Sequence, residues 1–144
     1  MNISVVIPVY NAERFVKKAV FSALEQPEVA EVVLINDGST DGSLEILELL
    51  EKNNNRIKIY HHKNKCNKGR SASRNLGIKK ATQPYIAFLD ADDFYLENRF
   101  KKDVNLFQFN PNIDGVYNMI GVFFYRDYSQ DEMSSLNRTG IDEQ

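Results

Sequence analysis

The sequence has one cysteine, little net charge and no long hydrophobic run, and each of these features excludes a class of protein. Cys66 has no second cysteine to pair with, which excludes an internal disulfide and suits a reducing compartment. A formal net charge of −2 gives no electrostatic reason to expect nucleic acid or an anionic membrane as a main partner. No apolar run approaches the length of a transmembrane helix, and the N-terminus has the pattern of a strand, not of a signal peptide. We therefore expect one globular cytoplasmic domain, with peripheral attachment at the inner face of the membrane as an open alternative.

The turn after the first expected strand lacks both glycine and acidic residues, since residues 8–11 are Pro-Val-Tyr-Asn. A dinucleotide-dependent oxidoreductase requires a glycine fingerprint at this place, because its backbone approaches the pyrophosphate closely. A response-regulator-like domain requires acidic residues there, and a phosphatase with an Asp-x-Asp nucleophile carries that motif on its first strand. The sequence therefore argues against these three classes.

Strand and helix patterns alternate four times along the chain. Strands are predicted at residues 3–9, 31–35, 56–62 and 85–89, and helices at 12–26, 43–52, 69–81 and 95–108. This alternation predicts an α/β fold with a largely parallel sheet, helices on both faces and right-handed crossovers. Pro8 cannot donate to a ladder, so the first strand should end there or lie at a sheet edge. A further strand is expected at 115–125, and the polar tail at 129–144 should be loosely ordered.

The strand at 56–62 alternates polar and apolar residues, which predicts a half-exposed strand near a sheet edge. Two histidines, His61 and His62, end this strand and would face opposite sides of it. They are therefore a poor metal-binding pair, and we interpret both as surface or strand-end residues.

The strand at 85–89 is a short apolar run, typical of a central strand that is buried on both faces of a parallel sheet. Three carboxylates follow it at once, Asp90, Asp92 and Asp93. Like charges this close raise the cost of ionising one another, whereas a bound Mg²⁺ or Mn²⁺ would stabilise them. If the chain stays extended, Asp90 and Asp92 point to the same side and can reach one ligand. The alternative is that one of the three caps the next helix.

Three more polar loops are expected beside these carboxylates, at the carboxyl ends of the strands. They are the turn at 8–11, the acidic turn at 36–41 and the helix start at 67–75, which carries Arg70 and Arg74. Carboxylates suit a metal, a helix N-terminus with arginines suits phosphate, and an acidic turn suits hydroxyl or NH donors. Together these loops describe a pocket for a nucleotide diphosphate.

Four motifs in this order resemble those of the family 2 glycosyltransferases. Residues 5–11 (Val-Val-Ile-Pro-Val-Tyr-Asn) resemble the family's opening strand and turn, and residues 36–41 (Asn-Asp-Gly-Ser-Thr-Asp) resemble its Asp-Asp-Gly-Ser-x-Asp turn. Residues 67–77 resemble its third signature, where Ala-Arg-Asn is commoner than Ser-Arg-Asn, and residues 88–93 (Phe-Leu-Asp-Ala-Asp-Asp) resemble its Asp-x-Asp motif. Each motif is weak alone, but four at fitting spacing are specific. The resemblance implies the GT-A fold, a Rossmann-like three-layer sandwich with a mainly parallel central sheet.

The resemblance also implies roles for individual residues. Those implied to bind the nucleotide are Pro8 and Tyr10 at the base and ribose, Asp37 at the uracil ring NH, Asn67 and Arg74 near the base or diphosphate, and Asp90 at the ribose. Those implied to hold a divalent cation, Mn²⁺ or Mg²⁺, across the diphosphate are Asp92 and, in support, Asp93. Simpler roles stay open: Asp37 and Asp41 as turn or capping residues, Arg74 as a surface charge and Tyr10 as a packed aromatic residue.

The implied function is metal-assisted transfer of a sugar from a nucleotide-diphosphate sugar, with a UDP-sugar as the expected donor, to a saccharide, a lipid-linked saccharide or another hydroxyl acceptor. The family's general base is not identifiable, because Asp127, Asp131 and Glu132 lie in the polar tail without a recognisable motif. We therefore expect residues 1–128 to form a donor-binding domain that is inactive or weakly active alone. An open sheet edge would favour a homo-oligomer. The alternative is a non-catalytic module that binds a sugar nucleotide or a partner.

Overall fold

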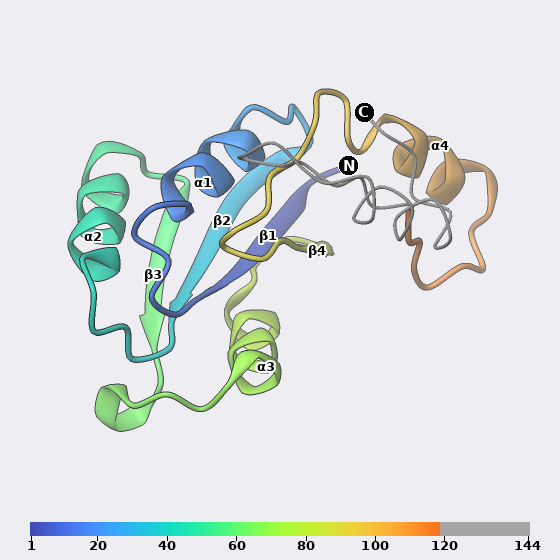
Figure 1. Ribbon diagram of the computed structural model, residues 1–144. Coiled ribbons are helices and arrows are strands. Elements are labelled where there is room, and N and C mark those ends of the chain that lie inside the picture. The colour runs from blue at the N-terminus through green and yellow to red at the C-terminus, as the bar shows by residue number, and fades with distance from the viewer. Residues whose placement is uncertain (119–144) are drawn as a thin grey trace, which may run out of the picture. The chain divides into compact units, whose positions relative to one another are not determined.

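The computed structural model describes residues 1–118, and its centre is a four-stranded parallel sheet (Figure 1). The strands are β1 (Ile3–Val9), β2 (Val29–Asn36), β3 (Ile57–His61) and β4 (Tyr85–Phe88), in the order β3-β2-β1-β4. The helices are α1 (Val16–Leu24), α2 (Ser43–Asn53), α3 (Arg70–Lys80) and α4 (Lys101–Phe109), with a 3₁₀ turn η1 (Lys63–Lys65). The predicted α/β architecture with a mainly parallel sheet is confirmed.

Helices cover both faces of the sheet, with α1 and α2 on one face and α3 on the other (Figure 1). Alternate residues of β1 pack on the two faces of the sheet, because successive side chains of a strand point to opposite sides. Val5 and Ile7 belong to the cluster packed against α1 and α2, whereas Val6 packs with Leu76 of α3. The interior strands β1 and β2 are almost fully buried. Together with the helices on both faces they form the core of a three-layer sandwich.

Small residues let α3 lie close to the sheet. Ser73 and Gly77 are the buried positions of this helix. A Cβ atom at Gly77 would overlap the side chain of Val6 in β1, so no larger residue fits there without a shift of the helix. This close contact holds α3 against the central strand and fixes where its N-terminal turn begins.

Pro8 lies inside an interior strand, so the expectation that the strand would end there or lie at an edge is wrong. β1 continues to Val9 and stays in register with β2 as far as Asn36. Its register with β4 ends at Val6, whose carbonyl accepts the Leu89 amide over 3.1 Å. Backbone groups two residues apart face the same neighbour, so the missing N–H of Pro8 would face β4 beyond the last pair. Pro8 therefore ends the β1–β4 ladder and leaves the β1–β2 ladder intact.

The strand predicted at 85–89 as central and buried on both faces lies instead at one end of the sheet that the structure describes, as β4. Only β1 pairs with it among the described strands. Ile86 and Phe88 are 38% and 43% exposed, whereas Leu89 is buried. The apolar run that suggested a central strand is therefore a strand with one face packed against the core, at Tyr85 and Ala87, and one uncovered face, at Ile86 and Phe88.

The helix predicted at 95–108 begins only at Lys101, because side-chain contacts hold the preceding segment in another conformation. The buried Gln26 side chain, just after α1, accepts a hydrogen bond from the Arg99 amide over 3.0 Å. Nε2 of the same Gln26 side chain donates to the Leu96 carbonyl over 3.1 Å. Such long-range contacts have no signature in the local sequence pattern.

The chain divides into two compact units, Met1–Leu106 and Phe107–Gln144, and the whole sheet belongs to the first. Within the described part of the chain, no helix is long and apolar enough to cross a membrane. The site described below lies entirely within the first unit.

Several predictions fall on the C-terminal part of the chain. The strand expected at 115–125 is not formed at 115–118, and its other positions lie outside the described residues. The loosely ordered tail expected at 129–144 also lies outside them, as do Asp127, Asp131 and Glu132.

Candidate functional site

A pocket of about 380 Å³ opens at the carboxyl ends of β1, β2 and β4, beside the N-terminus of α3. All four loops singled out in the sequence contribute to its wall. The predicted site residues that line it are Pro8, Tyr10, Asp37, Asn67, Asp90 and Asp92. Arg74 and Asp93 are not among its lining residues, and each is connected to the pocket through Asp90, as described below.

The turn after β1 is joined to the turn after β2 by reciprocal hydrogen bonds. Asn11, in the left-handed region with φ 49°, accepts a hydrogen bond from the Thr40 amide on its side-chain oxygen over 2.8 Å. The Asn11 amide donates to Ser39 Oγ over 3.2 Å. The side chain of Tyr10 in the same turn is 51% exposed and faces the pocket. These bonds fix two of the pocket loops relative to each other.

Asp41 acts as a turn and capping residue, the simpler role considered for the acidic turn. Its Oδ1 accepts the Ser43 amide over 3.0 Å, and its Oδ2 accepts the Glu13 amide over 3.1 Å. Burial acts to raise the pKa of Asp41, but hydrogen bonds from Ser43 and Glu13 outweigh it and hold the pKa below its usual value. Both oxygens thus support the backbone at the start of α2 and the neighbouring turn.

Asp37 lines the pocket and also holds the loop that precedes α3. Its Oδ1 accepts the Lys68 amide over 2.6 Å, its Oδ2 accepts the Gly69 amide over 2.9 Å, and the residue is only 3% exposed. Gly38 follows with φ 74°, and a Cβ atom there would lie 2.8 Å from the Asn67 nitrogen. Asp37 and Gly38 therefore determine where Asn67 and Gly69 stand in the pocket wall.

His62 directly follows β3, as the strand-end interpretation expected, but it is not a surface residue. Its side chain is 13% exposed, and its Nε2 lies 2.9 Å from Ser73 Oγ of α3. The same nitrogen lies 3.5 Å from Asp37 Oδ1. No motif marks His62, because its partners come from β2 and α3 and meet it only in the folded chain.

Asp90 accepts two arginines at the start of α3. Arg74 Nη2 donates to Asp90 Oδ1 over 2.7 Å, and Arg70 Nη1 lies 3.3 Å from Asp90 Oδ2. The Arg74 guanidinium also stands 5.6 Å from the centre of the Phe88 ring. Arg70 lines the pocket, and of the two arginines expected to suit phosphate it is the one to which the family resemblance assigned no role. Its side chain is 68% exposed, against 37% for Arg74.

The two remaining carboxylates, Asp92 and Asp93, are exposed. The pKa of Asp93 lies above that of an ordinary aspartate. Partial burial raises the pKa of Asp93, and the neighbouring Asp92 and Asp90 raise it further. The Asp93 amide donates to the Asp90 carbonyl over 3.1 Å, which closes a tight turn. Neither residue caps α4, which begins at Lys101, so the capping alternative for the acidic loop is wrong.

A divalent cation fits the donor set at this loop. No group of three potential metal ligands exists among residues 1–118, and Asp90 is already paired with arginines. Mg²⁺ and Mn²⁺ nevertheless bind through one or two carboxylates when phosphate oxygens complete the shell. Asp92 and Asp93 could supply hard oxygen ligands to such an ion.

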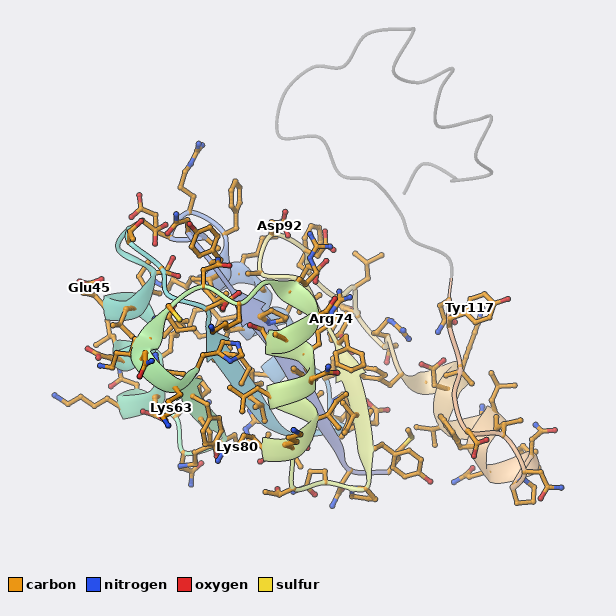
Figure 2. The ribbon with its side chains drawn as sticks, turned by 90° about the horizontal axis from the view of Figure 1, so that it is seen from below. Glu45, Lys63, Arg74, Lys80, Asp92 and Tyr117 are labelled. Atoms are coloured by element: carbon orange, nitrogen blue, oxygen red, sulfur yellow. The ribbon has the colours of Figure 1, made fainter. Side chains whose placement is uncertain are left out.

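Figure 2 shows how these groups lie relative to α3. Asp92 lies beyond the end of the helix that carries Arg74, whereas Lys80 marks the opposite end. The helix N-terminus is thus directed to the acidic loop, and its partial positive charge adds to that of the arginines.

The sequence matches the family described as Glycosyl transferase family 2 over residues 4–142. An uncharacterised glycosyltransferase of Haemophilus influenzae is 40% identical over 104 residues, which cover 72% of this chain and 41% of the relative. The glycosyltransferase GlyG of Streptococcus pneumoniae is 38% identical over 97 residues, covering 67% of this chain and 32% of the relative. The chain therefore spans less than half of the length of either relative.

Solved structures share the arrangement of the sheet and helices. Staphylococcus aureus TarS (residues 1–349), in complex with UDP-GlcNAc, matches 90% of this chain and 37% of its own with a TM-score of 0.72 and 28% identity. A mannosyltransferase from Pyrobaculum calidifontis, in complex with GDP-Man and Mn²⁺, matches 70% of this chain and 30% of its own with a TM-score of 0.60 and 20% identity. The second likeness supports the fold alone. The GT-A fold expected from the motifs is confirmed.

Proposed function

Since this chain belongs to glycosyl transferase family 2, we propose that it forms the donor-binding part of an enzyme that transfers a sugar from a UDP-sugar to a saccharide, a lipid-linked saccharide or another hydroxyl acceptor. One observation carries this proposal: four motif loops converge on a single pocket, whose lining includes Asp37 from the second loop, Arg70 from the third, and Asp90 and Asp92 from the fourth. A nucleotide diphosphate has matching chemistry, with a ring NH at one end and anionic phosphates at the other.

The base would bind between Asp37 and Tyr10. A carboxylate offers about four lone-pair sites, and backbone amides take two of those on Asp37, so an acceptor site remains for the ring NH of uracil. The half-exposed Tyr10 ring supplies a flat apolar surface, and Pro8 adds a rigid wall beside it. The complexes of TarS with UDP and UDP-GlcNAc support a uridine nucleotide, because TarS matches 90% of this chain at 27% and 28% identity in the two complexes.

The ribose and diphosphate would bind along Asp90 and the start of α3. Arg74 holds Asp90 at 2.7 Å and would keep its carboxylate directed at a ribose hydroxyl. Arg70 is more exposed and makes a looser contact of 3.3 Å, so its guanidinium is free to turn from Asp90 to a phosphate. Arginine suits this role because its planar fork matches phosphate oxygens.

Asp92, supported by Asp93, would hold a divalent cation together with the diphosphate. Such a cation, when bound, neutralises the charge that builds on the β-phosphate as the sugar leaves. The residues of this chain contribute the carboxylate ligands and, through Arg70 and the N-terminus of α3, further positive charge beside the leaving group.

We assign no general base, and we propose residues 1–128 as the donor-binding domain with an acceptor still to be identified. The chain spans less than half of the length of these relatives. The second candidate function is a non-catalytic module that binds a sugar nucleotide or a partner. Self-association through the uncovered side of β4 stays a prediction, motivated by the exposed Ile86 and Phe88.

Calorimetric titration of the 144-residue chain tests the proposal directly. With Mg²⁺ or Mn²⁺ present, UDP and UDP-GlcNAc should bind, and GDP-mannose should bind more weakly because guanine does not place the same NH at Asp37. Asp114→Asn serves as a control, since Asp114 is exposed and does not line the pocket. Absence of binding by every nucleotide diphosphate would contradict the proposal.

A further inference from the structure

Behind the base end of the pocket, three polar side chains from three different elements meet. Asp37 follows β2, His62 follows β3, and Ser73 lies in the first turns of α3. The side chains of Asp37 and His62 are 4% and 13% exposed, and Ser73 is fully buried. Buried polar groups of this kind are costly unless they are hydrogen-bonded, so their arrangement is specific.

The geometry of the cluster excludes a Ser-His-Asp nucleophile. In such a triad the two ring nitrogens of histidine contact different partners, one the serine and the other the aspartate. Here the single atom His62 Nε2 lies 2.9 Å from Ser73 Oγ and 3.5 Å from Asp37 Oδ1. The hydroxyl of Ser73 is also closed off from the pocket by burial. The cluster therefore holds groups in place and does not react.

We propose that His62 is a positioning residue for recognition of the base. Its Nε2 forms a hydrogen bond of 2.9 Å with Ser73 Oγ and lies 3.5 Å from Asp37 Oδ1, so we infer that His62 limits the orientations open to the Asp37 carboxylate in the pocket wall. The proposal rests on the proposed function, because it requires that Asp37 contacts the base of the nucleotide.

A carboxylate of aspartate needs such support, since its terminal torsion is broad and roughly two-fold. The amides of Lys68 and Gly69 hold Asp37 from one side, but both belong to a loop that itself depends on Asp37. His62 gives an independent anchor, because it is fixed at the end of β3 and by the helix residue Ser73. A carboxylate that contacts both the two amides and His62 presents its remaining lone pair in one direction, which favours one base over another.

Variants of His62 test this role when UDP and CDP are compared, because CDP lacks the ring NH. We expect His62→Ala to weaken UDP binding about fivefold to tenfold, because one polar contact that orients Asp37 is lost, and to move the UDP-to-CDP affinity ratio toward one. His62→Gln should keep most of the ratio, since its amide can contact both Ser73 and Asp37. His61→Gln is the matched control: His61 precedes His62 on β3, does not line the pocket and should leave the ratio unchanged.

Equal loss of UDP and CDP affinity in His62→Ala would overturn the proposal, because it would indicate a general structural role. If His62→Ala does not fold, Ser73→Ala takes its place, since it removes the other partner of Nε2 without adding volume. Ser73→Ala should also move the UDP-to-CDP affinity ratio toward one, but by less than His62→Ala. An unchanged ratio in a folded Ser73→Ala protein would overturn the proposal.

Nuclear magnetic resonance of the ligand-free chain separates this inference from the proposed function. The Lys68 and Gly69 amide signals report on the Asp37 carboxylate directly, since both donate to it. They should shift in His62→Ala and stay in place in His61→Gln, even if the wild-type chain proves to have no preference for UDP. Unshifted signals in His62→Ala would overturn the positioning role, whereas a missing UDP preference alone would contradict the proposed function.

Discussion

Arg74 Nη2 donates to Asp90 Oδ1 over 2.7 Å and so joins the second turn of α3 to the loop that follows β4. Arg70, one turn earlier, reaches the other oxygen of the same carboxylate at 3.3 Å. The two arginines differ in exposure, with 37% of the Arg74 side chain and 68% of the Arg70 side chain accessible. We infer that Arg74 is part of the framework of the pocket and that Arg70 is the arginine available to a ligand.

Alanine substitutions should separate these two arginines. Arg74→Ala should lower the free energy of unfolding by about 1 kcal/mol, because a short, partly exposed ion pair is lost and Asp90 is left less well held. Arg70→Ala should change it by less than about 0.5 kcal/mol, since exposed pairs contribute little. Urea unfolding followed by circular dichroism measures the change in the free energy of unfolding for both variants. Arg70→Ala should nevertheless weaken UDP binding in calorimetry, and a destabilisation equal to that of Arg74→Ala would contradict the division of roles.

Nucleotide binding should depend on a divalent cation through Asp92. Asp92→Asn keeps the shape of the side chain but removes a charged ligand, so the gain in UDP affinity on adding Mn²⁺ should largely disappear. In excess chelator the wild-type and Asp92→Asn chains should bind UDP with similar affinity. Calorimetry with and without Mn²⁺ gives both numbers, and Asp114→Asn is the control. Equal wild-type affinity for UDP in Mn²⁺ and in chelator would show that no cation takes part in binding.

Base selectivity should reside in Asp37 and not in the similar Asp41. Each carboxylate accepts two backbone amides, but only Asp37 lines the pocket. Asp37→Asn and Asp41→Asn should therefore both destabilise the fold, by roughly 1–3 kcal/mol, because one amide loses its acceptor. Only Asp37→Asn should also reduce the preference for UDP over CDP. If the two variants bind UDP and CDP with the same ratio as the wild type, the base lies elsewhere.

The loops of the site were predictable from the sequence because their chemistry follows each strand at once. Asp90 comes directly after an apolar run and Asp37 comes one residue after another. Parallel strands bring such residues to one edge of the sheet. The contacts of His62 and Gln26 were not predictable, since each depends on partners from distant elements. The position of β4 was also mispredicted, because apolar composition does not distinguish a strand covered on two faces from one covered on a single face.

Stability in acid should depend on Glu31, which lies on β2 beside β1. Burial acts to raise the pKa of Glu31, but hydrogen bonds from Ser4, Thr82 and Gln83 outweigh it and hold the pKa below its ordinary value of 4.5. A group with a depressed pKa in the folded state contributes stability above its unfolded pKa, and the contribution is lost as the pH falls through the folded pKa. Glu31→Gln should therefore unfold at a lower temperature than the wild type at neutral pH.

The difference between Glu31→Gln and the wild type should narrow as the pH falls below 4.5, where the wild-type carboxylate becomes protonated. Thermal unfolding at a series of pH values checks this. Glu97→Gln is the control, since Glu97 is exposed and should show no such trend. A difference that stays constant with pH would show that shape and not ionisation explains the contribution of Glu31.

Donor binding without sugar transfer is the expected behaviour of the 144-residue chain. The pocket wall consists of the four donor-side loops, and the chain matches 41% of the Haemophilus relative and 37% of the TarS structure. Transfer also requires a base in hydrogen-bond reach of the acceptor hydroxyl and an acceptor held near the sugar, effects each worth several powers of ten in rate.

We therefore expect UDP-sugars to bind and to be hydrolysed slowly at most, with no acceleration by saccharide acceptors. Release of UDP from a panel of UDP-sugars, measured with and without such acceptors, checks this, and Asp92→Asn gives the background rate. Acceptor-stimulated release at rates typical of enzymes would place the base within this chain, and Asp127, Asp131 and Glu132 would then be the first residues to substitute.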